Sequence, residues 1–333
     1  MALDMYWYDL LCYAIVGFAA VGAIWVLLRK EGCKASDDSD VYESLVAGRP
    51  QRSVGYVCES DLWKSCWRGV SPFWLMGVRF TSCLIMLGFM SWDVYDWTTS
   101  IFAYYTEWTF SLVIAYFALG TVVSAHGCWL HVTTEPATNG KRDELSVADL
   151  EESRAEGTWT YLAKHLRRQV WVRSRHYVDD EASERAGFLG YALQAVYQTC
   201  GGAVVLTDIV FWCVILPFLS NAHFKLNLLM GCMHSLNALF ILIDTSLNSL
   251  KFPWFRLSYF VLWTSAYVIF QWVMHACGQS WWPYPFLQLS TPWAPLWYSV
   301  MALLHLPCYG LFALLVRAKY ALFPKLFPNA FLH

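Results

Sequence analysis

The feature that most constrains this chain is a series of seven long apolar runs that carry almost no charge. An α-helix needs about 20 such residues to cross the hydrocarbon core of a bilayer, because each residue advances it by about 1.5 Å. The runs therefore predict an all-α membrane protein, built as a bundle of about seven transmembrane helices. They cover about residues 9–28, 72–91, 102–126, 188–217, 226–249, 255–276 and 295–318.

The composition is also typical of a membrane protein. Charged residues make up 14% of the chain and hydrophobic residues 57%, whereas a soluble domain usually carries about 25% charged residues. No basic stripe or phosphate-cradling glycine loop occurs, so nucleic acid is not expected as a partner. Residues 1–28 lack the basic segment and the small-residue cleavage site of a signal peptide, so we expect the first span to be retained.

The distribution of lysine and arginine predicts the orientation of the bundle. Seven of these residues follow the first run, nine follow the third, two follow the fifth and three follow the last, which is 21 of 23. Cytoplasmic loops are enriched in Lys and Arg. Seven spans with the N-terminus outside and the C-terminus in the cytosol place all 21 on the cytosolic side. Both the endoplasmic reticulum and the plasma membrane fit this orientation.

The spans group into one predicted core with added segments. Within the added loop, residues 157–172 (GTWTYLAKHLRRQVWV) place apolar and basic side chains on different helical faces, which is typical of a helix in the membrane interface. A helix packed on the cytosolic end of the bundle explains the same pattern. The core comprises residues 72–126 and 188–318, and the additions are an N-terminal helix at 1–30, a cytosolic linker at 31–71, a cytosolic loop at 127–187 and a cytosolic tail at 319–333.

In the predicted orientation, polar residues from four runs fall in the outer half of the bilayer. Ionisable residues inside a membrane are costly, and by default they are functional candidates that face the bundle interior. Structural alternatives exist for each: a hydrogen bond to the carbonyl one turn back for Thr106, an interhelical hydrogen bond for His234, a pair with Arg79 for Asp208, and an interfacial position for His275. The four residues are Thr106, Asp208, His234 and His275.

This combination of side chains suggests acyl-transfer chemistry. A threonine hydroxyl becomes a nucleophile when an adjacent base takes its proton, and a neutral imidazole is a common base. The indole N–H of Trp281 or Trp282 would stabilise the oxyanion, and a pocket open to lipid would suit an amphiphilic ester or amide. No span contains two histidines at the HxxH or HxxxH spacing of a zinc site. Neither a metal nor another cofactor is therefore expected.

Three segments of the chain resemble a known membrane family. LMGCMHSLNALFILID and SAYVIFQWVMHACGQSWWPYPFL are similar to the paired signatures of the androgen-induced gene-one protein family, which includes the androgen-dependent TFPI-regulating protein. YYTEWTFSLVIAYFALG resembles the segment with which that family begins a span. The resemblance covers about residues 72–316 without 133–187. The extra first span and the long loop are similar to the Rolling-stone-like and plant members.

The resemblance implies an activity and two catalytic residues. The enzymes of that family are metal-independent threonine hydrolases of fatty acid esters of hydroxy fatty acids. Their nucleophile corresponds to Thr106 and their histidine to His234, with Thr109 as a second candidate nucleophile one turn below. Asp208 and His275 are expected to support the pair. The alternative is a non-enzymatic membrane adaptor, or a cell-fusion or trafficking protein, in which these groups only join helices.

Overall fold

The computed structural model describes residues 6–31, 55–134, 185–218 and 228–332. In these ranges every regular element is helical, and the only extended pairings are three isolated β-bridges. Seven of the helices are long and apolar enough to cross a membrane. The predicted all-α fold with seven helices long and apolar enough to cross a membrane is therefore confirmed. The helix predicted for residues 157–172 lies outside the described residues.

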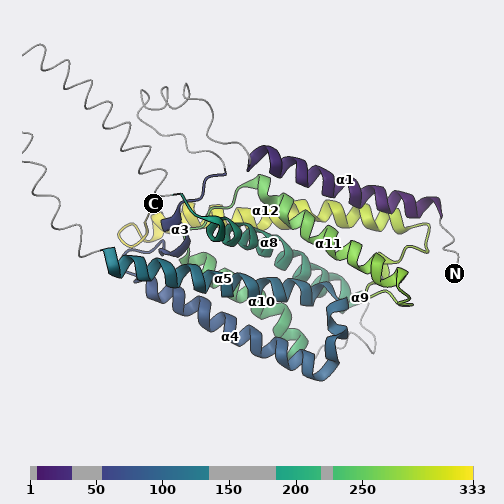
Figure 1. Ribbon diagram of the computed structural model, residues 1–333, viewed down its shortest axis with the longest axis horizontal. Coiled ribbons are helices and arrows are strands. Elements are labelled where there is room, and N and C mark those ends of the chain that lie inside the picture. Colours follow the sequence, from purple (N-terminus) through teal and green to yellow (C-terminus); the bar gives the residue numbers. More distant parts are fainter. Residues whose placement is uncertain (1–5, 32–54, 135–184, 219–227, 333) are drawn as a thin grey trace, which may run out of the picture.

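Seven helices form the bundle and short elements connect them (Figure 1). The seven are α1 (Trp7–Lys30), α4 (Pro72–Trp97), α5 (Tyr105–Thr134), α8 (Phe188–Val210), α10 (Leu228–Leu247), α11 (Leu257–Ala276) and α12 (Ala294–Leu326). The short elements are α3 (Glu59–Trp63), the 3-10 helices η1 (Thr98–Ala103), η4 (Trp254–Arg256) and η5 (Pro285–Leu287), the π-helical turn η3 (Phe211–Ile215) and α9 (Leu216–Phe218).

Helix α8 occupies the centre of the bundle. It packs against α5, α10, α11 and α12, while α1 covers the α11–α12 side and α4 covers the α5–α10 side (Figure 1). Successive spans run in opposite directions, so α1, α5, α10 and α12 begin at one end. We call this the Tyr105 end, and we call the other, where α4 begins, the Arg79 end.

Two adjacent glycines let the neighbours of α8 approach its backbone. A Cβ atom on Gly201 would lie 2.7 Å from the ring of Phe312 in α12, and one on Gly202 would lie 2.5 Å from the ring of Phe260 in α11. Both distances are below van der Waals contact. Small residues are favoured where membrane helices pack closely, because dispersion contacts rather than the hydrophobic effect hold them together. The glycine pair therefore fixes the position of α8 between α11 and α12.

Three helices extend well past the apolar runs that predicted them. Helix α4 continues to Trp97 instead of ending near residue 91, α5 continues to Thr134 instead of ending near residue 126, and α12 continues to Leu326 instead of ending near residue 318. The first residues of the predicted 127–187 loop and of the predicted 319–333 tail are therefore helical. A helix of the length of α12 spans about 50 Å, which exceeds the hydrocarbon thickness of about 30 Å. The last turns of α12 are supported by aromatic packing, because Phe323 and Phe327 both lie against the indole of Trp67 with ring centroids 5.4 Å apart.

The segment 55–71, which we call the cap, closes the Arg79 end. The Cys66 amide N–H and the Ser65 hydroxyl each donate to the Leu247 carbonyl at 2.9 Å. The Trp67 indole N–H donates to the Ser246 carbonyl at 2.8 Å. These carbonyls lie in the last turn of α10, where a helix leaves its C=O groups without intrahelical partners. This part of the 31–71 segment is therefore packed onto the bundle.

Candidate functional site

The sequence-predicted site residues all lie at the Tyr105 end of the bundle. Thr106 and Thr109 occupy the first turns of α5, Asp208 lies in the last turn of α8, His234 in the second turn of α10 and His275 in the last turn of α11. Because successive spans run in opposite directions, these residues lie at the same end of the bundle, as the sequence predicts. Their side chains nevertheless divide into separate contacts.

His234 and Asp208 face each other across the α8–α10 contact. The His234 Nδ1 atom lies 3.7 Å from the Asp208 Oδ1 atom, and the imidazole is 4% exposed. Neither atom has a hydrogen-bond partner among the described residues. The distance is slightly beyond a direct hydrogen bond, a separation at which a small inward movement or a bridging water completes the contact. The pair has the geometry of a base and the carboxylate that orients it.

The π-helical turn η3 positions an aromatic ring beside this pair. Phe211 follows Asp208 by three residues, and its ring stacks on the His234 imidazole with centroids 3.6 Å apart and planes 6° apart. A π-turn shifts the register of all later side chains, and such turns occur often at functional sites. On the α10 side, Asn237 is fully buried one turn after His234 and lies beside the Asp208 carboxylate. The imidazole thus lies against the Phe211 ring and beside the Asp208 carboxylate, which in turn lies beside Asn237.

Thr106 lies at the start of α5, beside Tyr284 from the segment between α11 and α12. The Tyr284 hydroxyl accepts the Tyr105 amide N–H at 3.2 Å, and the carbonyl of Ala103 accepts from the Tyr267 hydroxyl and the Gln271 amide at 2.8 and 2.7 Å. The first contact serves an amide N–H that the start of α5 leaves unpaired, and the other two serve a carbonyl that the end of η1 leaves unpaired. The Thr106 side chain itself is half-buried.

The hydrogen bonds of the described residues do not join Thr106 to His234. Thr109, one turn further into the bundle, is fully buried, and its hydroxyl lies 3.2 Å from that of Thr207 in α8. Thr207 directly precedes Asp208, so this contact links α5, which carries Thr106, to α8, which carries the Asp208 carboxylate. Thr109 therefore has a structural partner, whereas Thr106 stands nearer to the end of the bundle.

Two other predicted residues have simpler surroundings. The His275 imidazole stacks on Trp282 with ring centroids 4.4 Å apart, and Trp281 lies against Tyr104 with centroids 6.0 Å apart. These pairs cover the Tyr105 end, where α11 leaves the bundle. They place His275 among aromatic rings near the start of α5.

A pair of carboxylates at this end was not anticipated. Asp93 of α4 and Glu107 of α5 are 6% and 8% exposed, and their charges interact. One oxygen of each has no hydrogen-bond partner among the described residues. The sequence shows an acidic residue next to the candidate nucleophile, because Glu107 follows Thr106 directly. Only the packing of α4 on α5 shows that Asp93 lies opposite it.

A second threonine–histidine pair lies deeper in the bundle. The His305 Nδ1 atom lies 2.8 Å from the Met301 carbonyl, which can only accept, so Nδ1 carries the proton. Nε2 then accepts the Thr264 hydroxyl at 2.9 Å, and the Thr264 oxygen accepts the Tyr105 hydroxyl at 2.9 Å. This chain connects α12, α11 and α5. An intramembrane histidine was the signal that would have identified it.

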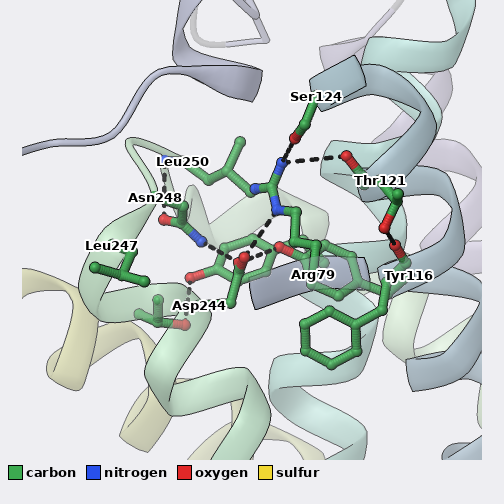
Figure 2. Close-up of polar contacts among 12 residues, drawn as sticks. Arg79, Tyr116, Thr121, Ser124, Asp244, Leu247, Asn248 and Leu250 are labelled. Atoms are coloured by element: carbon green, nitrogen blue, oxygen red, sulfur yellow. Dashed lines mark hydrogen bonds and ion pairs between the residues drawn. The ribbon is translucent and has the colours of Figure 1, made fainter. Parts of the chain in front are cut away.

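The intramembrane arginine, Arg79, forms its ion pair far from this site. Arg79 is fully buried at the other end, where its Nε donates to the Asp244 carboxylate at 2.8 Å and its Nη1 donates to the Ser124 hydroxyl at 2.8 Å (Figure 2). Tyr116 donates to the second oxygen of Asp244. The alternative in which Asp208 pairs with Arg79 is therefore wrong, because the guanidinium pairs with Asp244.

Comparison with known proteins gives no family for this chain. No protein-family model matches the sequence, and no curated protein and no solved structure matches it. The resemblance of the three segments and the residues at the Tyr105 end therefore carry the functional interpretation.

Proposed function

We propose that this protein is an integral membrane hydrolase of lipid esters, with fatty acid esters of hydroxy fatty acids as the substrate class. Thr106 is the nucleophile, His234 is the general base and Asp208 orients the imidazole. The observation that carries the proposal is the His234–Asp208 pair, 3.7 Å apart, in which the His234 imidazole is buried and stacks on Phe211. It lies at the end of the bundle where the resemblance places the nucleophilic threonine.

The reaction follows the order of other acyl transfers. The Thr106 hydroxyl attacks the ester carbonyl while His234 takes its proton, which gives a tetrahedral intermediate and an imidazolium that Asp208 stabilises. The imidazolium returns the proton to the departing alkoxide, so the hydroxy fatty acid leaves and the acyl group stays on Thr106. Water, activated by His234, then releases the fatty acid. Catalytic hydrogen bonds often tighten only when substrate is bound.

The orientation is part of the proposal. The N-terminus lies outside and the C-terminus in the cytosol, because 21 of 23 Lys and Arg residues then face the cytosol. The Tyr105 end, with the candidate site, is then on the outer side. A lipid ester in the outer leaflet reaches it from within the membrane.

Substitution of the two central residues tests the mechanism. Thr106→Ala and His234→Ala should each reduce hydrolysis to background, and the double variant should be no slower, because residues that act as a unit have non-additive effects. Thr106→Ser should retain part of the activity. Thr109→Ala is the matched control on the same helix: it removes the contact with Thr207 and should leave turnover within a few-fold. The measurement is hydrolysis of a fatty acid ester of a hydroxy fatty acid by purified, equally folded variants.

The same set of variants separates the alternatives. Full turnover by Thr106→Ala would refute the Thr106 mechanism, and loss of turnover in Thr264→Val alone would transfer the role to the Thr264–His305 pair. If the parent protein does not hydrolyse the ester and a fluorophosphonate probe labels none of its threonines, the groups only join helices, as in a membrane adaptor. Asp208→Asn should lower kcat by at least tenfold with little change in KM, because the substrate does not touch that side chain.

A further inference from the structure

A groove at the Arg79 end is separate from the proposed hydrolase site. One wall is a stripe on α12, and the facing wall is Lys251 with Phe252, between α10 and α11. The groove encloses about 390 Å³. Residues three and four apart share one face of a helix, so the stripe is continuous along the axis. Its members are Ala313, Val316, Arg317, Tyr320 and Ala321.

The wall that faces α12 is held in place from behind. The Lys251 carbonyl accepts hydrogen bonds from the buried side-chain amides of Gln194 and Gln198 in α8, the latter at 2.8 Å. The Phe252 ring packs on Tyr309 with centroids 4.6 Å apart. Neither contact depends on a ligand. The groove is therefore formed in advance, and a molecule that binds there pays little to order its walls.

The groove carries positive charge at its rim. The Lys251 side chain is 60% exposed, and its ion pair with Asp61 is long, at 3.9 Å between the charged atoms. Exposed pairs of this kind are weak and are screened by salt, so Lys251 can exchange Asp61 for an anionic ligand at little cost. Arg317 is exposed and forms no ion pair with another described residue. Two cationic groups thus flank a floor of aliphatic and aromatic side chains, which suits an anion attached to an apolar chain.

The depth of Arg317 agrees with an interfacial ligand. It lies about 23 residues after the start of α12, or about 35 Å along the helix at about 1.5 Å per residue. The hydrocarbon core is about 30 Å thick, so the guanidinium reaches the layer of lipid phosphates. Trp254, 45% exposed at the start of α11, is at the same end, and exposed tryptophans favour the interface. Ala313 and Val316 of the groove floor precede Arg317 in α12 and therefore lie closer to the bundle centre, at the depth of the lipid acyl chains.

We propose that this groove binds one anionic phospholipid. Its phosphate lies between Lys251 and Arg317, and one acyl chain lies along the α12 stripe toward Ala313. Basic pockets between transmembrane helices recognise lipid headgroups in this way. The site is independent of the hydrolase proposal, because no residue of the candidate catalytic site lines it.

Charge-neutralising variants of the full-length protein test the headgroup part. Phosphatidylglycerol should bind at least tenfold tighter than phosphatidylcholine in native mass spectrometry of the purified protein. A basic residue near a lipid surface contributes about 1 kcal/mol, or about fivefold, so Lys251→Gln and Arg317→Gln should each weaken phosphatidylglycerol binding by about that factor. Lys325→Gln, an exposed lysine of α12 outside the groove, is the matched control and should change it less than twofold. An equal loss in Lys325→Gln would overturn the proposal in favour of unspecific attraction.

A groove-filling pair of variants tests the acyl part without changing charge. Ala321→Trp places an indole in the groove and should weaken phosphatidylglycerol binding by at least tenfold. Leu322→Trp, at a 52% exposed neighbour outside the groove, should leave it unchanged. Unchanged binding in Ala321→Trp would refute the groove as the site. Millimolar glycerol 3-phosphate, which has the phosphate without the chains, should not displace the lipid, and displacement would show that the site takes a free phosphate.

Discussion

At the scale of single residues, the turn that leads into the candidate nucleophile is strained. Thr98 joins α4 to η1 with φ 61° and ψ −164°, a region that a β-branched residue rarely adopts. Such conformations cost about 1–3 kcal/mol and persist only where surrounding structure imposes them. Here the tyrosine and glutamine contacts around Ala103 and Tyr105 hold the start of α5. The turn that sets the direction of Thr106 therefore stores strain.

Thr98→Gly should release that strain. Glycine adopts this conformation freely and costs about 0.5–1 kcal/mol in chain entropy, which leaves a net gain. We expect the midpoint of thermal unfolding in detergent to rise by about 2–4 °C. Thr99→Gly is the control, since that residue lies in η1 without a positive φ, and it should lower the midpoint. A lower midpoint for Thr98→Gly would contradict the strained turn.

The sequence predicts some residues of the site and not others, for a physical reason. Apolar runs define the depth of a side chain, and depth alone brings His234 and Asp208 to the same end of the bundle. Depth does not define the direction in which a helix face points, because these spans are apolar on nearly all sides. Only the packing of the helices shows which side chains meet. It separates Thr106 from His234, and it brings together Asp93 with Glu107 and Thr264 with His305.

At the scale of elements, the cap is an ordered lid over the last turns of α10 and α12. Its Cys66 is 2% exposed, and burial raises the pKa of the thiol, although nearby Lys319 opposes this. A higher pKa leaves less thiolate at neutral pH, and the thiolate is the reactive form. Cys66 should therefore resist alkylation as long as the cap stays closed.

Trp67→Ala should open the cap. The substitution removes the indole hydrogen bond to Ser246 and the packing on Phe323 and Phe327. We expect N-ethylmaleimide to modify Cys66 at least tenfold faster, as measured by peptide mass spectrometry. Trp92→Ala, at a 47% exposed residue of α4, should leave the rate unchanged. Modification of Cys66 in the parent as fast as that of the exposed Cys277 would contradict a closed cap.

The element boundaries show what hydropathy can predict. The apolar runs predict all seven long helices. In lipid, a single chain segment can pair all its backbone N–H and C=O groups only as a helix, so each long apolar run indicates one helix. The extension of α12 to Leu326 was not predicted, because its last turns lie beyond the hydrocarbon and are stabilised by Trp67, which is distant in sequence. The π-turn after Asp208 has no signal in the apolar pattern, although it brings Phe211 onto His234.

At the scale of the whole molecule, the proposed orientation can be measured directly. An N-glycosylation tag at the N-terminus or within residues 278–294 should be modified in cells, since glycosylation occurs on the non-cytosolic side. The same tag at the C-terminus should remain unmodified, which serves as the internal control. A glycosylated C-terminus would reverse the bundle and place the candidate site on the cytosolic side. Gel mobility before and after glycosidase treatment reads out each case.

The buried Arg79–Asp244 pair has a consequence for the synthesis of the chain. Its two members are 165 residues apart, so α4 leaves the ribosome long before α10 exists. During that interval Arg79 does not yet have Asp244 as a partner. An unpaired arginine opposes membrane insertion by about 2.5–3.5 kcal/mol at the centre of a span, and by less for Arg79, which is the eighth residue of α4. We therefore expect α4 to be less stably inserted before α10 is made than after it. On this reasoning, the fifth span completes the insertion of the second, because it supplies the carboxylate of Asp244.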